Sequence, residues 1–355
     1  MSFNCFLIRF VMSRYKILDY VPQKDVDKLI HFLKYHWKED HVFVKSRLLL
    51  DFQHYNKDIN GYTFVVAENQ ETGEYDALEG YIPTYLYDDK LKSQGDYWSA
   101  LWRRREDVDP KQLGFIGIQV HMRQMKLPNF HSLGSVNPSD YAKKVHKGLN
   151  AVMEDMIQYY ILNDSIKEFK IAGNVGFVES DIPSDNTYSL EFKDKIDWDQ
   201  LNLEGYYHPL KTLEFFKNRY ANHPIYKYSF INVYHHKELA AIFATRIIHV
   251  NNSSCIRIVD VLGKMPEANI KRQLLDILYD LNAEYIDVLN WGIPRSVFTM
   301  MGFDILDVNG RLIIPNYFEP FEQRNVVFKM VYNGVYKDYV VFKGDADYDR
   351  PNVLP

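Results

Sequence analysis

The chain has 355 residues, a formal net charge of −5, and 46% hydrophobic residues. This composition is that of a globular chain long enough for two domains at roughly 100–200 residues each. The mild acidity argues against a nucleic-acid protein held by a general positive field, and the 15% aromatic share argues against low-complexity disorder.

Cysteine usage and hydropathy give the next exclusions. The two cysteines, Cys5 and Cys255, form neither a disulfide framework nor a CxxC metal motif, so we expect a reducing, cytoplasmic setting. The apolar stretch at residues 3–12 is too short to span a bilayer and lacks the features of a secretory signal. We predict no membrane span and no metal site.

The first half of the chain alternates helical and strand patterns. Val26, Leu29 and Leu33 share one face of a helix predicted over 25–37, and residues 42–55 predict a second helix. Strands are predicted at 62–69, 74–87 and 97–107. A helix then runs from Gly114 to about residue 127, followed by a strand at 131–136, a helix at 138–147 and a strand at 151–162. This alternation predicts a mixed sheet covered by helices.

The same order returns in the second half. Residues 209–224 predict a helix, 226–236, 238–250 and 253–263 three strands, and 266–281 a helix with Pro266 at its start. A strand at 284–289, a short helix at 294–302 and closing strands at 303–321 and 325–332 follow. The fold class predicted is therefore α/β, with two domains of one architecture at 15–162 and 205–355. The polar, turn-rich residues 163–204 predict a linker or insertion.

The segment VDPKQLGFIGIQVHMRQMK, residues 108–126, places Gly114 and Gly117 between a strand and a helix. Free backbone N–H groups and the positive end of a helix dipole suit a pyrophosphate, and glycine lets a ligand come close to the backbone. The same glycines are also typical of a tight turn. Neither the P-loop pattern nor the GxGxxG pattern is present.

With this loop, the element order resembles the GNAT superfamily of acyl-coenzyme A-dependent N-acyltransferases. In that family a three-strand run leads to a [Q/R]xxGx[G/A] loop and a helix, then to a strand ending near an Asn and a helix closing in YxxxGF. The match covers about residues 15–162 and 206–332. In the first copy Lys111, Gly114 and Ile116 fall on the loop pattern, and Gly302-Phe303 match the closing pattern in the second. The second loop departs, with Pro266 and Glu267 where small residues are expected.

The resemblance implies acetyl-CoA as co-substrate, bound by the first copy. Its pyrophosphate would lie on backbone amides of the loop, and the implied cofactor-binding residues are Lys111, Leu113, Gly114, Phe115, Ile116, Gly117 and Asn137. The family tyrosine that protonates the leaving thiolate is replaced by Lys144 and Phe298, so Tyr141, one helical turn earlier, is the substitute acid. Glu79 is the candidate base; the alternative is a solvent-facing strand carboxylate.

Other polar residues are candidates for substrate binding. His36 and Asp40 form an i,i+4 pair that could line a substrate, bind a metal or cap a helix junction, with Asp40 as the N-cap. Arg257 and Asp260 lie on an otherwise apolar strand, where charged residues face a cleft, are paired with a partner or stay exposed. The acidic tail GDADYDRPN, from Gly344, lacks the residues that complete a calcium loop. We expect it to be ordered against the second domain.

Three functions follow. The first is N-acyl transfer from acetyl-CoA to a small-molecule amine. The segments HWKEDHVFVKSRLLLDFQH, residues 36–54, and FKGDADYDRPN, residues 342–352, resemble a bacterial group of tandem GNAT-like proteins associated with surface-polysaccharide synthesis. This resemblance implies a nucleotide-linked amino sugar as the amine. The second is a degenerate tandem GNAT-like scaffold that binds a sugar or a partner protein. The third is aminoacyl transfer from charged tRNA, which the lack of a basic stripe disfavours; we expect no nucleic-acid partner.

Overall fold

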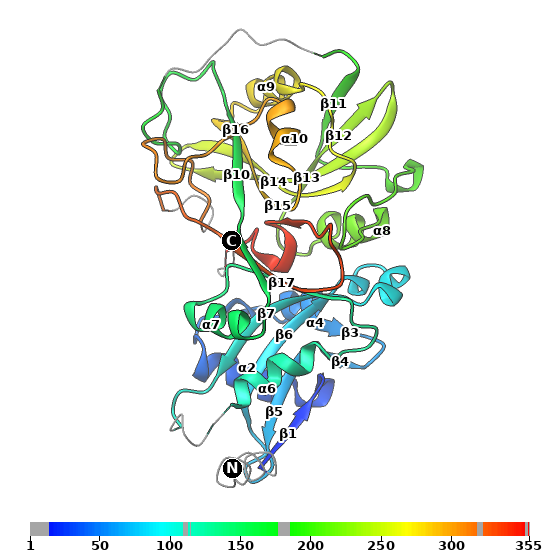
Figure 1. Ribbon diagram of the computed structural model, residues 1–355, viewed down its shortest axis with the longest axis vertical. Helices are drawn as coiled ribbons and strands as arrows, with labels where there is room; N and C mark the ends of the chain where they lie inside the picture. Colours follow the sequence, from blue (N-terminus) through cyan, green and yellow to red (C-terminus); the bar gives the residue numbers. More distant parts are fainter. Residues whose placement is uncertain are drawn as a thin grey trace. The chain divides into compact units, whose positions relative to one another are not determined.

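The computed structural model describes residues 14–108, 113, 115–176, 185–317, 322–351 and 354. The chain forms two compact units (Figure 1). Unit 1 contains residues up to Ser135 and a short return at Asn333–Val335, and unit 2 contains Val136–Tyr332 and Tyr336–Pro351. This division comes earlier than the predicted boundary after residue 162.

Unit 1 is built on five strands that pair in the order β1-β5-β6-β7-β8. The first three pairings are antiparallel and β7 runs parallel to β8. Their bounds are β1 (Tyr15–Leu18), β5 (Phe64–Asn69), β6 (Tyr75–Pro83), β7 (Asp96–Arg104) and β8 (Ser132–Val136). A small sheet joins β2 (Val21–Pro22), β4 (Gly61–Tyr62) and β3 (Tyr55–Asn56).

Helices cover both faces of the unit 1 sheet. They are α2 (Val26–His36), α3 (Val42–Lys45), α4 (Arg47–His54) and α6 (Ile116–Gln124), with 3₁₀ turns at Thr84–Leu86 and Asp89–Gln94. On β6, Glu79 meets His121 of α6, while a Cβ on Gly80 would point at His54 of α4. Since successive strand residues face opposite sides, α4 and α6 lie on opposite faces of the sheet.

The single helix predicted over 42–55 is wrong. Ser46 is extended, with φ −130° and ψ 100°, and its hydroxyl accepts a hydrogen bond from Leu49 N. It therefore caps α4 and ends α3, as serine favours at an N-cap. The predicted N-cap Asp40 is also wrong, because His41 Nδ1 accepts the hydrogen bond from Phe43 N.

Unit 2 contains an eight-stranded sheet in the order β11-β12-β13-β14-β15-β10-β16, with β18 on β15. The strands are β10 (Ile157–Leu162), β11 (Tyr188–Lys193), β12 (Ser229–His235), β13 (Glu238–Val250), β14 (Ser253–Gly263), β15 (Tyr285–Trp291), β16 (Asp304–Ile305) and β18 (Val341–Phe342). β9 (Val152–Asp155) pairs with the start of β17 (Lys329–Gly334). The helices are α7 (Asp140–Gly148), α8 (Leu213–Phe216), α9 (Lys271–Asp280) and α10 (Arg295–Met300), with a π turn at Lys217–Ala221 and 3₁₀ turns at Trp198–Gln200 and Asp345–Asp347.

Three further boundaries differ from the sequence prediction. Residues 151–162 form two strands, and β10 pairs with β15 and β16, so it belongs to unit 2. The predicted linker 163–204 contributes β11, the edge strand beside β12. Helix α9 begins at Lys271 instead of at Pro266.

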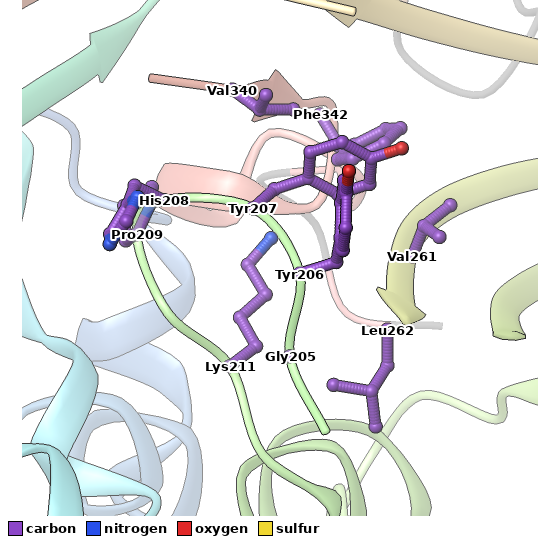
Figure 2. A pocket seen from close by; sticks show the side chains of 10 residues that line it. All are labelled: Gly205, Tyr206, Tyr207, His208, Pro209, Lys211, Val261, Leu262, Val340 and Phe342. Atoms are coloured by element: carbon purple, nitrogen blue, oxygen red, sulfur yellow. The ribbon is translucent and has the colours of Figure 1, made fainter. Parts of the chain in front are cut away.

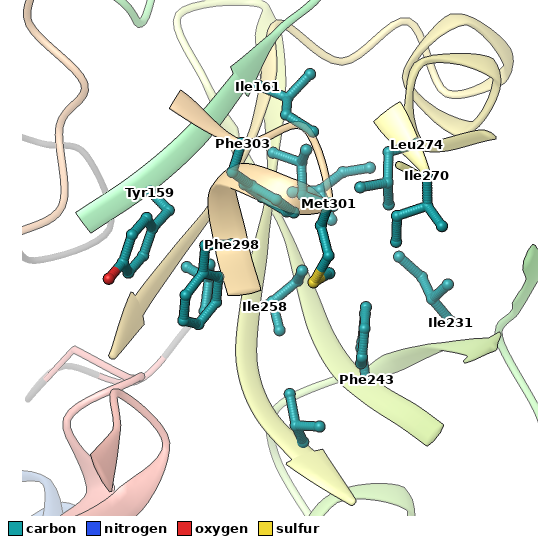
Figure 3. Close-up of a cluster of buried hydrophobic side chains, with 14 of the residues drawn as sticks. Tyr159, Ile161, Ile231, Phe243, Ile258, Ile270, Leu274, Phe298, Met301 and Phe303 are labelled. Carbon is teal, nitrogen blue, oxygen red and sulfur yellow. The ribbon is translucent and has the colours of Figure 1, made fainter. Parts of the chain in front are cut away.

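The unit 2 core gathers side chains of β10, β12–β15, α9 and α10 (Figure 3). Phe298 of α10 is fully buried, and its ring stacks on Tyr159 of β10 at a centroid distance of 3.9 Å. Phe298 stands at one of the two positions where the GNAT resemblance implies a catalytic tyrosine. Its surroundings make it a packing residue.

We expect Phe298→Ala to lower the free energy of unfolding by about 3–5 kcal/mol, because it leaves a cavity beside Tyr159. Phe298→Leu, which keeps most of the volume, is the matched control and should cost less. Urea denaturation measures both. A loss below about 1 kcal/mol for the alanine variant would contradict this packing role.

Candidate functional site

The parallel pairing of β7 with β8 ends well before β7 does. The paired residues are Asp96 with Ser132, Tyr97 with Leu133 and Trp98 with Gly134, whereas β7 continues to Arg104. From Ala100 onward β7 is only half-buried. In open α/β sheets ligands bind at the carboxyl ends of parallel strands. We call this region, between the end of β7 and β8, the unit 1 gap.

Helix α6 begins directly after the loop that leaves β7, and it packs on β5, β6 and β7. Leu113 and Ile116 are buried core residues, whereas Phe115 is 68% exposed. A Cβ added to Gly117 would meet only Trp102 Nε1, at 3.8 Å. Gly117 is buried, but neither backbone strain nor tight packing requires a glycine at this position. The predicted Lys111 and Gly114 lie outside the described residues.

Glu79 is fully buried at the centre of a polar cluster between β6, β7 and α6. Its Oε1 accepts a 2.5 Å hydrogen bond from Ser99 Oγ, and His121 Nδ1 lies 3.0 Å from both carboxylate oxygens. Gln124 Nε2 donates to the backbone carbonyls of Glu79 and Gly80. Burial lowers the pKa of His121, but the charge of Glu79 outweighs this and the pKa is raised. The cluster thus favours an imidazolium–carboxylate pair.

Trp102 links this cluster to the start of α6. Its ring stacks on His121 at 4.7 Å, and its Nε1 donates a 3.0 Å hydrogen bond to the carbonyl of Gly117. Trp102 lies on the part of β7 that has outrun β8. Glu79 and His121 therefore hold the indole that joins the unit 1 gap to the first turn of α6.

The remaining predicted residues are dispersed. His36 Nδ1 lies 3.6 Å from Asp107, and exposed Asp40 pairs with Lys38 at 3.2 Å. In unit 2, Tyr141 is 54% exposed, and Asn137 has φ +48° with its N–H donating to the carbonyl of Lys329.

Arg257 and Asp260 belong to two different buried networks in unit 2. Arg257 pairs with Asp287, its register partner on β15, at 3.0 Å. Asp260 accepts hydrogen bonds from Lys211 Nζ at 2.5 Å and Tyr220 OH at 2.6 Å. Both charges are thus satisfied inside the protein, the internal pairing that the sequence left open as one alternative.

A small hollow lies next to the Asp260 network (Figure 2). The loop Gly205–Lys211 forms one wall, and Val261 and Leu262 at the end of β14 and Val340 and Phe342 near β18 form the others. Neither this pocket nor the roles of His121, Ser99 and Trp102 were predicted from the sequence. The spacing of these residues along the chain carries no signal, because the fold alone brings them together.

The described residues contain no group of three or more His, Cys, Asp or Glu side chains arranged to hold a metal ion. In the same part of the chain, every helix is too short or too polar to cross a membrane.

Comparison with known proteins bears on the fold. No family model and no curated protein matches the sequence. A solved structure from Enterococcus faecalis V583, described as a probable N-acyltransferase, has a TM-score of 0.50 and 8% identity over 90% of this chain and 72% of that chain. The predicted fold class is confirmed. This likeness shows the fold alone: two GNAT-like domains, each with a mixed sheet flanked by helices.

Two other solved structures resemble the chain more distantly. A GCN5-related N-acetyltransferase from Anabaena variabilis ATCC 29413 has a TM-score of 0.48 and 11% identity, over 91% of this chain and 73% of that one. A tandem GNAT protein from the clavulanic acid biosynthesis pathway has a TM-score of 0.43 and 10% identity, over 91% of this chain and all of that one.

The His121–Glu79 pair predicts a pH-dependent stability. Because the pKa of His121 is raised in the folded protein above the unfolded value of about 6.5, its stabilisation is complete below that pH and is lost as pH rises through the folded pKa. The difference in unfolding free energy between wild type and His121→Gln should therefore shrink as pH rises from 6 to 9. Urea denaturation across this range measures it, and a difference that stays constant or grows would exclude the charged pair.

Proposed function

We propose that the chain is an N-acyltransferase that moves an acyl group from a coenzyme A thioester to an amine, with the donor bound in unit 1. The observation that carries this proposal is the unit 1 gap, which opens beside the start of α6. The fold, shared with a probable N-acyltransferase, supports it.

The two parts of the gap suit the two chemical parts of such a donor. The first backbone N–H groups of α6 have no partner within the helix and, with the helix dipole, favour a pyrophosphate. The end of β7 presents backbone groups that β8 does not pair, and the amide-bearing arm of coenzyme A can add to such an edge as an extended strand does. Gly117 lets the phosphates approach the helix.

The chemistry needs few protein groups. The amine nitrogen attacks the thioester carbonyl, a C–N bond forms, the C–S bond breaks, and the proton lost by nitrogen balances the departing thiolate. Backbone N–H groups aimed at the carbonyl oxygen would stabilise the charge that develops there. Orientation of the two reactants supplies much of the rate enhancement.

We assign Glu79 a positioning role in place of the base role predicted from the sequence. It is fully buried, and its oxygens are occupied by Ser99 and His121. A carboxylate so placed acts through His121 on Trp102 and on the first turn of α6. Tyr141 as the acid, and Asn137 as a donor contact, stay predictions.

Acetyl-CoA is the first donor to test, and an amino sugar or its nucleotide-linked form is the first acceptor. The sequence resemblance to proteins of surface-polysaccharide synthesis motivates this choice. An acceptor panel that also includes amino acids and polyamines identifies the acceptor class, with release of free thiol as the readout.

Glu79→Gln tests the positioning role. It keeps the shape of the side chain but removes the charge that favours protonated His121. We expect a raised KM for the donor, at least about fivefold, with a smaller change in kcat, because the site is loosened without loss of a reacting group. A fall in kcat of several orders of magnitude at unchanged KM would instead restore the base assignment.

Gly117→Val tests the donor site. The valine side chain would stand over the first turn of α6, so acetyl-CoA affinity should fall at least about tenfold, which is about 1.4 kcal/mol. The melting temperature should change little, because the nearest atom to the added Cβ, Trp102 Nε1, lies at an ordinary contact distance of 3.8 Å. Gly176→Val, at an exposed position where an added Cβ meets nothing within 4 Å, is the control. Calorimetric titration and thermal unfolding measure the pair; equal affinity in the folded variant and wild type, or no binding to wild type, would refute the donor site.

A further inference from the structure

Unit 2 repeats the strand geometry of the unit 1 gap. β14 runs parallel to β15 and pairs with it at Ile256–Ile286, Arg257–Asp287 and Ile258–Val288. β14 then continues to Gly263 and β15 to Trp291. The two strands thus diverge at their carboxyl ends, as β7 and β8 do. We call the space between them the unit 2 groove.

The chain's own C-terminal segment fills the unit 2 groove. β18 pairs antiparallel with β15, with Phe342 opposite Asn290 and Val341 opposite Trp291. On the other side, Gly344 N donates a 2.7 Å hydrogen bond to Val259 O of β14. The Asn290 side chain donates to the carbonyl of Val341 at 3.0 Å. Residues 341–344 therefore bridge β14 and β15 at the level where their mutual pairing has ended.

The fit of this segment depends on a glycine. A Cβ on Gly344 would stand 2.7 Å from Val259 O and 2.8 Å from Tyr220 OH. Both distances are below what real Cβ atoms show, and Val259 O is backbone that moves only with β14. No other residue fits here without displacing the segment or the strand.

Buried charges hold the segment on its far side. Lys211 lies between Asp260 of β14, at 2.5 Å, and Asp345 of the segment, at 3.1 Å. Asp345 Oδ2 also accepts a 2.9 Å hydrogen bond from Phe342 N, which closes a turn within the segment. Arg219 donates to the carbonyl of Gly344 at 2.7 Å.

The contacts continue to the end of the described chain. Arg219 pairs with Asp347 at 2.6 Å, Tyr228 OH donates to Asp349 at 2.5 Å, and Arg246 donates to the carbonyl of Asp349 at 2.6 Å. For residues 344–351, the described part of the acidic tail, the expectation of order against the second domain is confirmed. Its carboxylates have protein cations as partners: Lys211 for Asp345, Arg219 for Asp347 and Arg350 for Asp349.

We propose that the unit 2 groove is a peptide-binding surface whose ligand is the sequence YVVFKGDADYDR, residues 339–350, supplied here by the chain itself. This ligand combines a short strand, Val341–Phe342, with a turn at Asp345–Asp347. Val341–Phe342 meets the groove as a strand meets a sheet edge: backbone pairing gives affinity, and Gly344 with the three acidic residues gives specificity. The groove would accept the same segment from solution once the chain's own copy is displaced. The acyl donor would then bind only in unit 1, and this last point rests on the proposed function.

The test uses the full chain with Gly344→Val, which displaces the segment sterically. Asp345→Asn is a milder second variant should the first not fold, and Gly176→Val is the control. Hydrogen exchange at residues 341–344 should be slow in wild type and Gly176→Val and at least about tenfold faster in the two displaced variants. A synthetic peptide of residues 339–350 should bind the displaced variants with a dissociation constant below about 1 mM, the effective concentration typical of a tethered segment. The same peptide should not bind wild type, whose own segment occupies the groove.

Fast exchange in wild type, or a displaced variant that gains no affinity for the peptide, would overturn the proposal. A peptide in which glycine 344 is replaced by valine should fail to bind and is the specificity control. Acetyl-CoA titration is run in parallel. We expect one bound acetyl-CoA per chain in wild type and in each displaced variant. Two bound acetyl-CoA molecules per wild-type chain would overturn the assignment of the groove to the segment. Absence of any donor binding would refute the proposed function while leaving the peptide result to decide the groove.

Discussion

Backbone hydrogen bonding at two parallel strand pairs is the constraint on which much of this structure depends. A strand that outruns its neighbour leaves N–H and C=O groups that need partners if they are buried. In unit 2 the chain meets this need internally, because β18 and Gly344 supply the partners between β14 and β15. In unit 1 the end of β7 is half-buried, so its groups are available to solvent or to a ligand. One geometry thus yields a filled groove in one unit and a candidate ligand site in the other.

Buried charge is distributed in a matching way. Unit 1 contains the buried cluster of Glu79, Ser99 and His121, on which Trp102 of the candidate site stacks. It also contains a second ion pair, between buried Asp76 and Arg105. In unit 2, buried charged residues hold the C-terminal segment and β15. Arg257 is paired with Asp287, and Lys343 donates to the carbonyl of Asn316. Burial and the neighbouring Arg257 hold the pKa of Lys343 well below its usual range. Removal of one member of a buried pair leaves an uncompensated charge, so a single substitution in these networks is strongly destabilising.

The two units have therefore diverged in what their equivalent strand ends do. The hollow beside Lys211 has walls that include Val340 and Phe342, so it exists only while the C-terminal segment is in place. The open end in unit 1 involves no such segment among its described residues. Two units of the same architecture therefore need not bind the same ligand, because another segment of the chain can pair with the strand end in one unit and not in the other.

The sequence by itself determined the local elements and their order. The apolar face of α2, the strands β5 to β7 and the glycine-bearing entry to α6 follow from periodicity and turn chemistry, and the repeated order predicted two domains of one fold. Tertiary structure alone decided which sheet β10 joins, because a strand pattern does not specify its partner. It also decided that Glu79 is enclosed by His121 and Ser99, and that the acidic tail runs between β14 and β15. These outcomes depend on contacts between residues far apart in the chain, and the spacing of residue types along a sequence contains no measure of such distances.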